Sequence, residues 1–188
     1  MLQAREYRVL KKQFFSSGSY SLVPIRLEDC YQIMQWRNEQ IYHLRQIKPL
    51  TKEDQDQYFE KVVAKIFDQE KPDQILFSFL QDEKCIGYGG LVHINWIDLN
   101  AEISFIMDTS LESDLFEFHW ERFLSLIEKA AFQEIKLHKL FVFSFDIRPH
   151  LYKVLENNNY FKDAVLKEHC RIDDYFKDVV IYSKITSL

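Results

Sequence analysis

The 188-residue sequence is short of the residues that mark several common classes of protein. Four glycines and four prolines are too few for a loop-dominated or low-complexity chain. Three widely spaced cysteines form no C-x-x-C pair, which favours a reducing, cytoplasmic location. No apolar run reaches roughly 18 residues, and the first residues lack the apolar core of a signal peptide. We therefore expect a cytoplasmic protein with no membrane partner.

Basic clusters are also missing. Lys and Arg are scattered, the net charge is −5 and the pI is about 5.7, so nucleic acid is not an expected partner. What the chain does have is apolar: 47% hydrophobic residues, with 16 Phe and 10 Tyr. A chain of this size and composition predicts one domain over residues 1–188, with 1–19 as an N-terminal hairpin extension. The abundance of Phe and Trp makes a homodimer a reasonable expectation.

Periodicity and turn residues predict the order of the elements. Two strands flank the turn at 16–19, helices follow over 27–38 and from Thr51 to near Pro72, and a hairpin and a strand over 73–108 form a meander. A helix after 112, an apolar strand over 137–147, a short helix at 149–158 and a hairpin turning at 173–176 complete the chain. The predicted fold class is α/β (α+β), with a mostly antiparallel mixed sheet and about four helices. The three glycines Gly87, Gly89 and Gly90 fall in one strand and indicate a bulge or a close backbone approach.

Three segments in this order resemble the GNAT N-acetyltransferase superfamily, in particular its ribosomal-protein and amino-sugar branches. They are "WRN" at 36–38, "CIGYGGLVHINWIDLNAEISFIMD" at 85–108, and "LHKLFVFSFDIRPHLYKVLENNNYFKDAVLKEH" at 137–169. The resemblance covers about residues 20–186. It implies a single GNAT-like domain that transfers an acetyl group from acetyl-CoA, the donor substrate, to a primary amine, with no metal.

The resemblance also implies where the donor binds. The pantetheine arm would pair with the strand that holds Phe105, Ile106 and Met107, and the pyrophosphate would meet the next helix near Leu115 and Phe116. Arg148, where the family has an asparagine, would contact the phosphates of the adenosine end.

The phosphate-binding segment departs from the family pattern. "IMDTSLESDLFEF" has no glycine and no basic residue, and it carries Glu112 and Asp114. Acids stabilise a helix N-terminus by about 0.3–1 kcal/mol each and would repel a pyrophosphate. A capping box between Thr109 and Glu112 is the alternative use of the same donors.

Two residues are predicted to be catalytic. Glu102, in "AEIS", occupies a family position near the amine and can accept a proton directly or through water. The alternative is an ion pair with a basic neighbour. Tyr152 is the predicted acid toward the thiolate, because Leu155 fills the usual tyrosine position one turn later. The alternative for Tyr152 is a surface position on an amphipathic helix.

The predicted acceptor site combines Trp36, Arg37 and Asn38 at the end of the first helix with His93 of the meander. Arg37 could recognise a carboxylate or phosphate on the acceptor, or serve only as a cation at a helix C-terminus. The loop over 38–50 carries Tyr42, His43 and Arg45 and could close over the acceptor. His93 is also a second candidate for the general base, beside Glu102, and it fits a plain surface or hydrogen-bonded histidine as well.

"EHC" at 168–170 has too few neighbours for a metal site. The sequence therefore predicts an N-acetyltransferase acting on a small-molecule amine, such as an amino-sugar nucleotide, or on a protein N-terminus. Two alternatives stay open. The chain could be a GNAT-fold binding or assembly module that has lost acetyl-CoA binding, or it could use a donor other than CoA.

Overall fold

The computed structural model describes residues 5–186 and contains one mixed sheet in the order β1-β2-β3-β4-β5-β6-β8-β7. The strands are β1 Phe15–Ser17, β2 Tyr20–Pro24, β3 Ile75–Gln81, β4 Lys84–Asn95, β5 Asn100–Met107, β6 Lys139–Phe145, β7 Phe161–Ile172 and β8 Tyr175–Ile185. The α-helices are α1 Cys30–Glu39, α2 Lys52–Tyr58, α3 Ala64–Ile66, α4 Glu112–Glu128 and α5 Pro149–Asn157. Short η1 Leu27–Asp29, η2 Ile41–His43 and η4 Thr109–Leu111 are 3₁₀ turns, and η3 Phe59–Val63 and η5 Lys129–Ile135 are π-helical.

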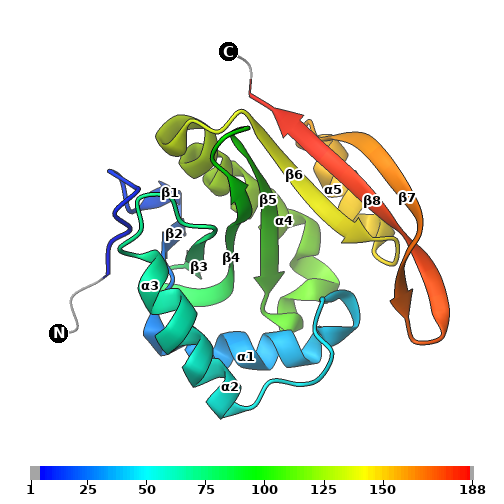
Figure 1. The fold of residues 1–188 in the computed structure, drawn as a ribbon, viewed down its shortest axis with the longest axis horizontal. Helices are drawn as coiled ribbons and strands as arrows, with labels where there is room; N and C mark the ends of the chain where they lie inside the picture. The colour runs from blue at the N-terminus through cyan, green and yellow to red at the C-terminus, as the bar shows by residue number, and fades with distance from the viewer. Residues whose placement is uncertain (1–4, 187–188) are drawn as a thin grey trace.

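Helices cover both faces of the sheet. α1 and the continuous α2–η3–α3 helix lie on the near face in Figure 1, while α4 and α5 lie behind it. On the rear face Phe105 stacks on Phe123 of α4 at 4.0 Å between ring centroids, and Trp120 meets Phe105 edge-on. The predicted α/β class, the meander and the four helical bodies are confirmed.

The N-terminal segment differs from the prediction. The turn at Gly18 (φ 60°) does join two strands, but the first begins only at Phe15. Before it the chain folds back on itself, because the Tyr7 hydroxyl donates to the Leu76 carbonyl and the Gln13 amide donates to the Tyr7 carbonyl. These bonds satisfy the backbone without a strand. Residues 1–4 of the predicted extension lie outside the described residues.

Two of the glycines in β4 allow close approach of neighbouring strands, as predicted. A Cβ at Gly89 would lie 2.2 Å from the Ser104 carbonyl oxygen of β5, and one at Gly90 would lie 2.0 Å from the Ile75 carbonyl oxygen of β3. Both contacts are with backbone atoms, which cannot move independently of their strands. The glycines therefore help to fix the position of β5.

The sheet opens between β5 and β6, its one parallel pair within residues 5–186. Their pairing is confined to Asn100–Glu102 against Lys139–Phe141, and beyond it the strands diverge in a V (Figure 1). β5 stays paired to β4 as far as Met107, and β6 stays paired to β8 as far as Phe145. The inner edge of each strand is therefore left open along the V.

No helix within residues 5–186 has both the length and the apolar character that a membrane crossing requires.

Candidate active site

A cleft of about 370 Å³ occupies the V between β5 and β6. Strands β4, β5 and β6, the loop after α1 and the start of α5 all contribute to its walls. The lining residues on which the argument depends are Arg37, His43, Arg45, His93, Glu102, Ser104, Phe105, Ile106, Phe143, Arg148 and Leu151. The predicted residues Glu102, His93, Arg37, Phe105, Ile106 and Arg148 are thus brought together in one cavity.

Glu102 lies where β5 and β6 separate and binds two side chains. Its Oε2 is 2.9 Å from Nδ1 of His93, and its Oε1 is 3.3 Å from Nη2 of Arg45. The Glu102 side chain is 13% exposed, whereas His93 is 64% exposed, so the carboxylate is covered and the imidazole faces the cleft. An ion pair with a basic neighbour is the alternative to a catalytic role that the sequence leaves open for Glu102. The structure contains this ion pair, with Arg45, and places it inside the cleft.

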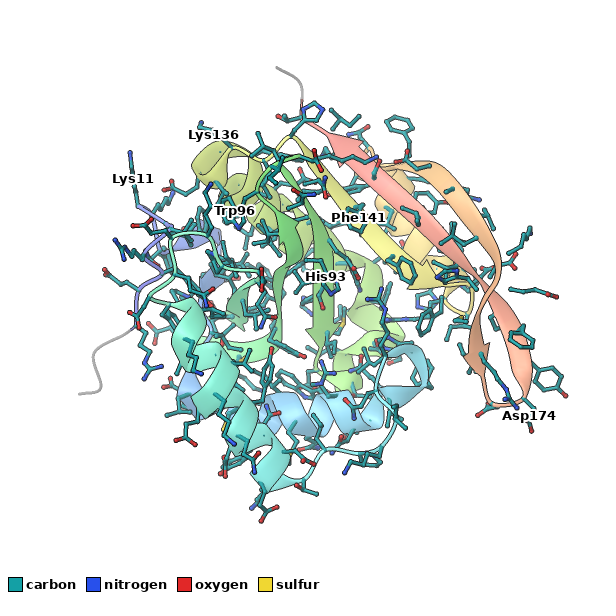
Figure 2. The ribbon with its side chains drawn as sticks, in the orientation of Figure 1. Lys11, His93, Trp96, Lys136, Phe141 and Asp174 are labelled. Atoms are coloured by element: carbon teal, nitrogen blue, oxygen red, sulfur yellow. The ribbon has the colours of Figure 1, made fainter. Side chains whose placement is uncertain are left out.

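His93 reaches Glu102 because β4 is irregular at this point. Val92 is the Cα partner of Glu102, and the β4–β5 register then breaks until Asn95 pairs with Asn100. His93, inside the break, has a positive φ of 50°. Figure 2 labels His93 near the middle of the near face of the sheet, with Phe141 on β6.

The loop after α1 crosses the mouth of the V. The Arg45 guanidinium lies 4.3 Å from the ring centroid of Phe143 on β6 while it binds Glu102 on β5. Asn38 fixes this loop, since its amide donates to the Leu50 carbonyl and accepts from the Leu50 N–H and the Gln46 amide. Asn38 thus shapes the cleft without lining it.

Two polar side chains hold the Arg37 guanidinium in place. Its Nη1 donates to the Tyr88 hydroxyl at 2.6 Å, and its Nε donates to Gln46 Oε1 at 3.1 Å. The side chain reaches the cleft wall with no carboxylate bound to it among the described residues. A cation at the base of the cleft is therefore available to an anionic ligand.

Arg148 and Glu112 form an ion pair at the other end of the cleft. Arg148 Nη2 lies 2.7 Å from Glu112 Oε1, and the side chains are only 8% and 18% exposed. Phe116 packs on the guanidinium at 5.0 Å, and no residue within 5–186 bonds to Arg148 Nε. Burial raises the pKa of Glu112 and lowers that of Arg148, and in each case the partner's charge opposes part of the shift.

His43 joins this pair to the loop. Arg148 Nη1 lies 3.2 Å from Nδ1 and 3.1 Å from Nε2 of the ring, and Nε2 is also 3.2 Å from Gln40 Oε1. The Gln40 oxygen can only accept, so Nε2 donates to it, and Nδ1 is then the nitrogen that accepts from Arg148. Burial, helped by the Arg148 charge, lowers the pKa of His43 to about 3. Gln40 in turn donates to the Met107 carbonyl at the end of β5. The loop after α1 is therefore attached, through an uncharged histidine, to the end of the cleft where Arg148 and Glu112 form their ion pair.

The predicted capping box of Thr109 and Glu112 is wrong. Asp108 caps the preceding 3₁₀ turn, accepting from the Ser110 N–H, and α4 starts with no side-chain cap. Glu112 turns to Arg148, a residue 36 positions away whose approach no local pattern reveals. Asp114 is exposed in the first turn.

Six predicted site residues lie outside the cleft lining. Trp36 and Met107 are buried in the core, Leu115 is 41% exposed on α4, and Asn38 is the loop anchor. Tyr152 donates to Asp146 at 2.9 Å and stacks on Tyr182, and burial raises its pKa well above the usual range. Phe116 is buried and reaches the site through Arg148.

The "EHC" segment lies on β7, where Cys170 donates to the Lys177 carbonyl. Within residues 5–186, no three His, Cys, Asp or Glu side chains are grouped as a metal site requires.

Comparison with known proteins identifies the family to which this chain belongs. The acetyltransferase (GNAT) domain matches residues 22–174. No curated protein matches the sequence. Among solved structures, spermidine N-acetyltransferase from Vibrio cholerae in complex with CoA and spermine has a TM-score of 0.76 at 16% identity, covering 90% of this chain and 96% of that one. Mutant forms of the spermidine/spermine N-acetyltransferase SpeG from the same organism give 0.74 at 19% identity, covering 90% and 95%.

A probable acetyltransferase also matches, with a TM-score of 0.72 at 14% identity, covering 92% of this chain and 96% of that chain. At such low identity these likenesses establish the shared fold. The family match extends over most of the chain, including the V, the cleft and the phosphate-binding segment. The chain therefore belongs to the GNAT acetyltransferase family and is an acyltransferase of that class.

Proposed function

We propose that this protein transfers an acetyl group from acetyl-CoA to the amine of a small molecule that also carries an anionic group. The observation that carries the proposal is the V between β5 and β6, open beyond Glu102, with a carboxylate–histidine pair at its apex and a buried arginine at its far end. The apex provides proton acceptors, and the far end provides positive charge for phosphates.

The residues of the cleft fit the donor. The inner edge of β5 over Ile103–Ile106 has no strand partner from β6, so its backbone groups can pair with the amides of a pantetheine arm. Arg148 supplies the charge that the glycine-free segment lacks, and its buried Nε, which no described residue bonds, offers a further donor. Phosphate binding here requires Arg148 to exchange its bond with Glu112 for one with the ligand.

Acetyl-CoA supplies an activated acyl group as a thioester. The chain's own residues place the amine at the apex, where the pair of Glu102 and His93 takes up the proton that the amine must lose before attack. The loop after α1 reaches this point through Arg45, which binds Glu102 and packs on Phe143. Tyr152 as the acid toward the thiolate stays a proposal, one that requires its bond to Asp146 to break.

The charges of the cleft favour an anionic amine as acceptor. Glu102 is the one carboxylate among the described lining residues, and it already binds Arg45 and His93. Arg37, Arg45 and Arg148 line the same cavity. A polyamine, the ligand named for the spermidine N-acetyltransferase above, would meet these cations with little opposite charge. An amino-sugar nucleotide, or another amine with a phosphate or carboxylate, would pair with them.

A panel of acceptors tests the proposal. With acetyl-CoA at saturation, thiol release is measured with glucosamine 6-phosphate, glucosamine, spermidine and a peptide with a free N-terminus. We expect glucosamine 6-phosphate to exceed glucosamine, its phosphate-free control, by tenfold or more in kcat/KM, and spermidine to be the poorest. Faster turnover of spermidine would refute the anionic class, and preference for the peptide would favour a protein N-terminus.

The alternative is a GNAT-fold binding or assembly module. It is favoured by one observation, the Glu112–Arg148 pair, which already neutralises the cation that a phosphate would use. The alternative predicts no response to acetyl-CoA.

The expected homodimer stays a prediction. It is supported by three apolar side chains that are exposed on the β7–β8 hairpin, Phe161, Tyr175 and Phe176. Light scattering would test it.

A further inference from the structure

We propose that His93, rather than Glu102, is the general base of the transfer, and that Glu102 is the positioning residue that fixes its tautomer. The inference rests on the proposed function and assigns roles within its apex. It is carried by three observations at the apex: the hydrogen bond between the two side chains, the irregular backbone at His93, and the ion pair of Glu102 with Arg45.

The hydrogen bond determines which nitrogen of His93 is free. An ionised carboxylate can only accept, so the Nδ1 atom 2.9 Å from Glu102 Oε2 carries the proton. The other nitrogen, Nε2, then has the lone pair. Because the His93 side chain lines the cleft and is 64% exposed, this lone pair is accessible to an incoming amine.

The backbone shows that His93 is turned toward this position. Val92 and Glu102 are Cα partners and so share one face of the sheet, whereas strict alternation would send the next residue, His93, to the opposite face. The break in register and the φ of 50° turn its side chain back to Glu102. This conformation is strained for a histidine, and strained backbone conformations in proteins are concentrated at functional sites.

Arg45 makes Glu102 a poor base and a good anchor. One carboxylate oxygen binds Arg45 and the other binds His93, while the side chain is only 13% exposed. A carboxylate that holds two donors has little capacity left for a proton from the substrate, whereas its charge stabilises a protonated imidazole. The other charged groups lining the cleft, Arg37 and Arg148, lie on α1 and at the start of α5 and are bound elsewhere.

The proton balance follows from these roles. The ammonium form of the acceptor gives one proton to Nε2 of His93, and the neutral amine attacks the thioester carbonyl. The C–N bond forms, the nitrogen of the tetrahedral adduct loses one proton, the C–S bond breaks, and the thiolate takes up one proton. The products are the N-acetyl amine, the free thiol and one net proton, which His93 releases to solvent.

The test is single-turnover acetyl transfer with enzyme in excess, so that product release does not mask the chemical step. His93→Asn is the informative variant, because asparagine tolerates a positive φ and can still donate to Glu102 but cannot act as a base. With the best acceptor of the panel, we expect its rate to fall by about 10²–10⁴-fold, with the dissociation constant for CoA unchanged. Above neutral pH its remaining rate should rise in proportion to hydroxide.

Two further variants separate the roles. Glu102→Gln leaves His93 in place but loses the tautomer control, so its rate should fall less than that of His93→Asn. His138→Asn, at an exposed histidine outside the cleft, is the matched control and should keep the wild-type rate.

A His93→Asn variant within threefold of wild type, alongside a much slower Glu102→Gln, would overturn the inference and make Glu102 the base. A wild-type protein that transfers no acetyl group to any panel amine would instead overturn the proposed function.

Discussion

The buried pair of Arg148 and Glu112 leads to a prediction in which the two partners are unequal. Glu112→Gln leaves the Arg148 guanidinium, 8% exposed, without a counter-charge. Removing one partner of a buried pair costs about 3–5 kcal/mol. For a chain of this length each kcal/mol lowers Tm by about 2–4 °C, so a fall of about 6–20 °C is expected.

Arg148→Met should cost less, about 1–3 kcal/mol. Glu112 is more exposed than Arg148, at 18%, and lies in the first turn of α4, where the helix dipole favours a carboxylate. The double variant Glu112→Gln/Arg148→Met leaves no buried charge at this pair, so it should be more stable than Glu112→Gln alone. Urea unfolding of the four proteins measures the cycle.

The same substitution should act in the opposite sense on the ligand. Without Glu112, Arg148 is free for phosphate and one repelling charge is removed, so Glu112→Gln should bind CoA more tightly in calorimetry although it unfolds more easily. Glu112→Gln within about 0.5 kcal/mol of wild type, or additive losses in the double variant, would refute the account of the pair.

Three other predictions concern stability. The ring nitrogens of buried His119 have no partner within residues 5–186, so His119→Phe should raise the free energy of unfolding by about 1 kcal/mol in urea titrations; a loss would show an unrecognised polar role. Gly89→Ala, whose Cβ would lie 2.2 Å from the Ser104 carbonyl oxygen, should lose about 1–3 kcal/mol in the same titrations, and an unchanged stability would contradict the close approach of β5. His43 has a folded pKa of about 3, below its unfolded value of 6.5, so its contribution is complete above pH 6.5 and is lost as pH falls from 6.5 toward 3. His43→Gln should flatten that part of the stability–pH curve, and an unchanged slope would contradict the assignment.

The elements of the fold could be predicted from the sequence where the signal is local. The helix from Thr51 has its capping box with Asp54, and the meander turns at 82–83 and 96–99 as its turn residues indicate. The strand at 137–147 is a partial failure. Its apolar composition is typical of a buried central strand, yet the burial of β6 alternates, because Phe143 and Phe145 are apolar residues that line the cleft rather than pack in the core. Composition cannot distinguish those two environments.

The site could be predicted only in part, for a similar reason. Family position or residue type is enough to predict four residues of the cleft, namely Glu102, His93, Arg37 and Arg148. Their partners are not visible in the sequence, because Glu102 is 9 positions from His93 and 57 from Arg45, and Arg148 is 36 positions from Glu112. The sequence places His43 in the 38–50 loop but does not predict its contacts with Arg148 and Gln40. Tyr152 failed to reach the cleft because Asp146, six residues earlier, offers it a closer partner.

Acetyl-CoA binding is the central claim, and thermal denaturation with and without the donor tests it most directly. A ligand at about 100 times its dissociation constant stabilises the folded state by about 2.7 kcal/mol. For this chain that is a rise in Tm of about 5–11 °C at millimolar acetyl-CoA, and it should be smaller in Arg148→Met. An unchanged Tm at about 1 mM acetyl-CoA, with no thiol released in the presence of the panel amines, would contradict the account.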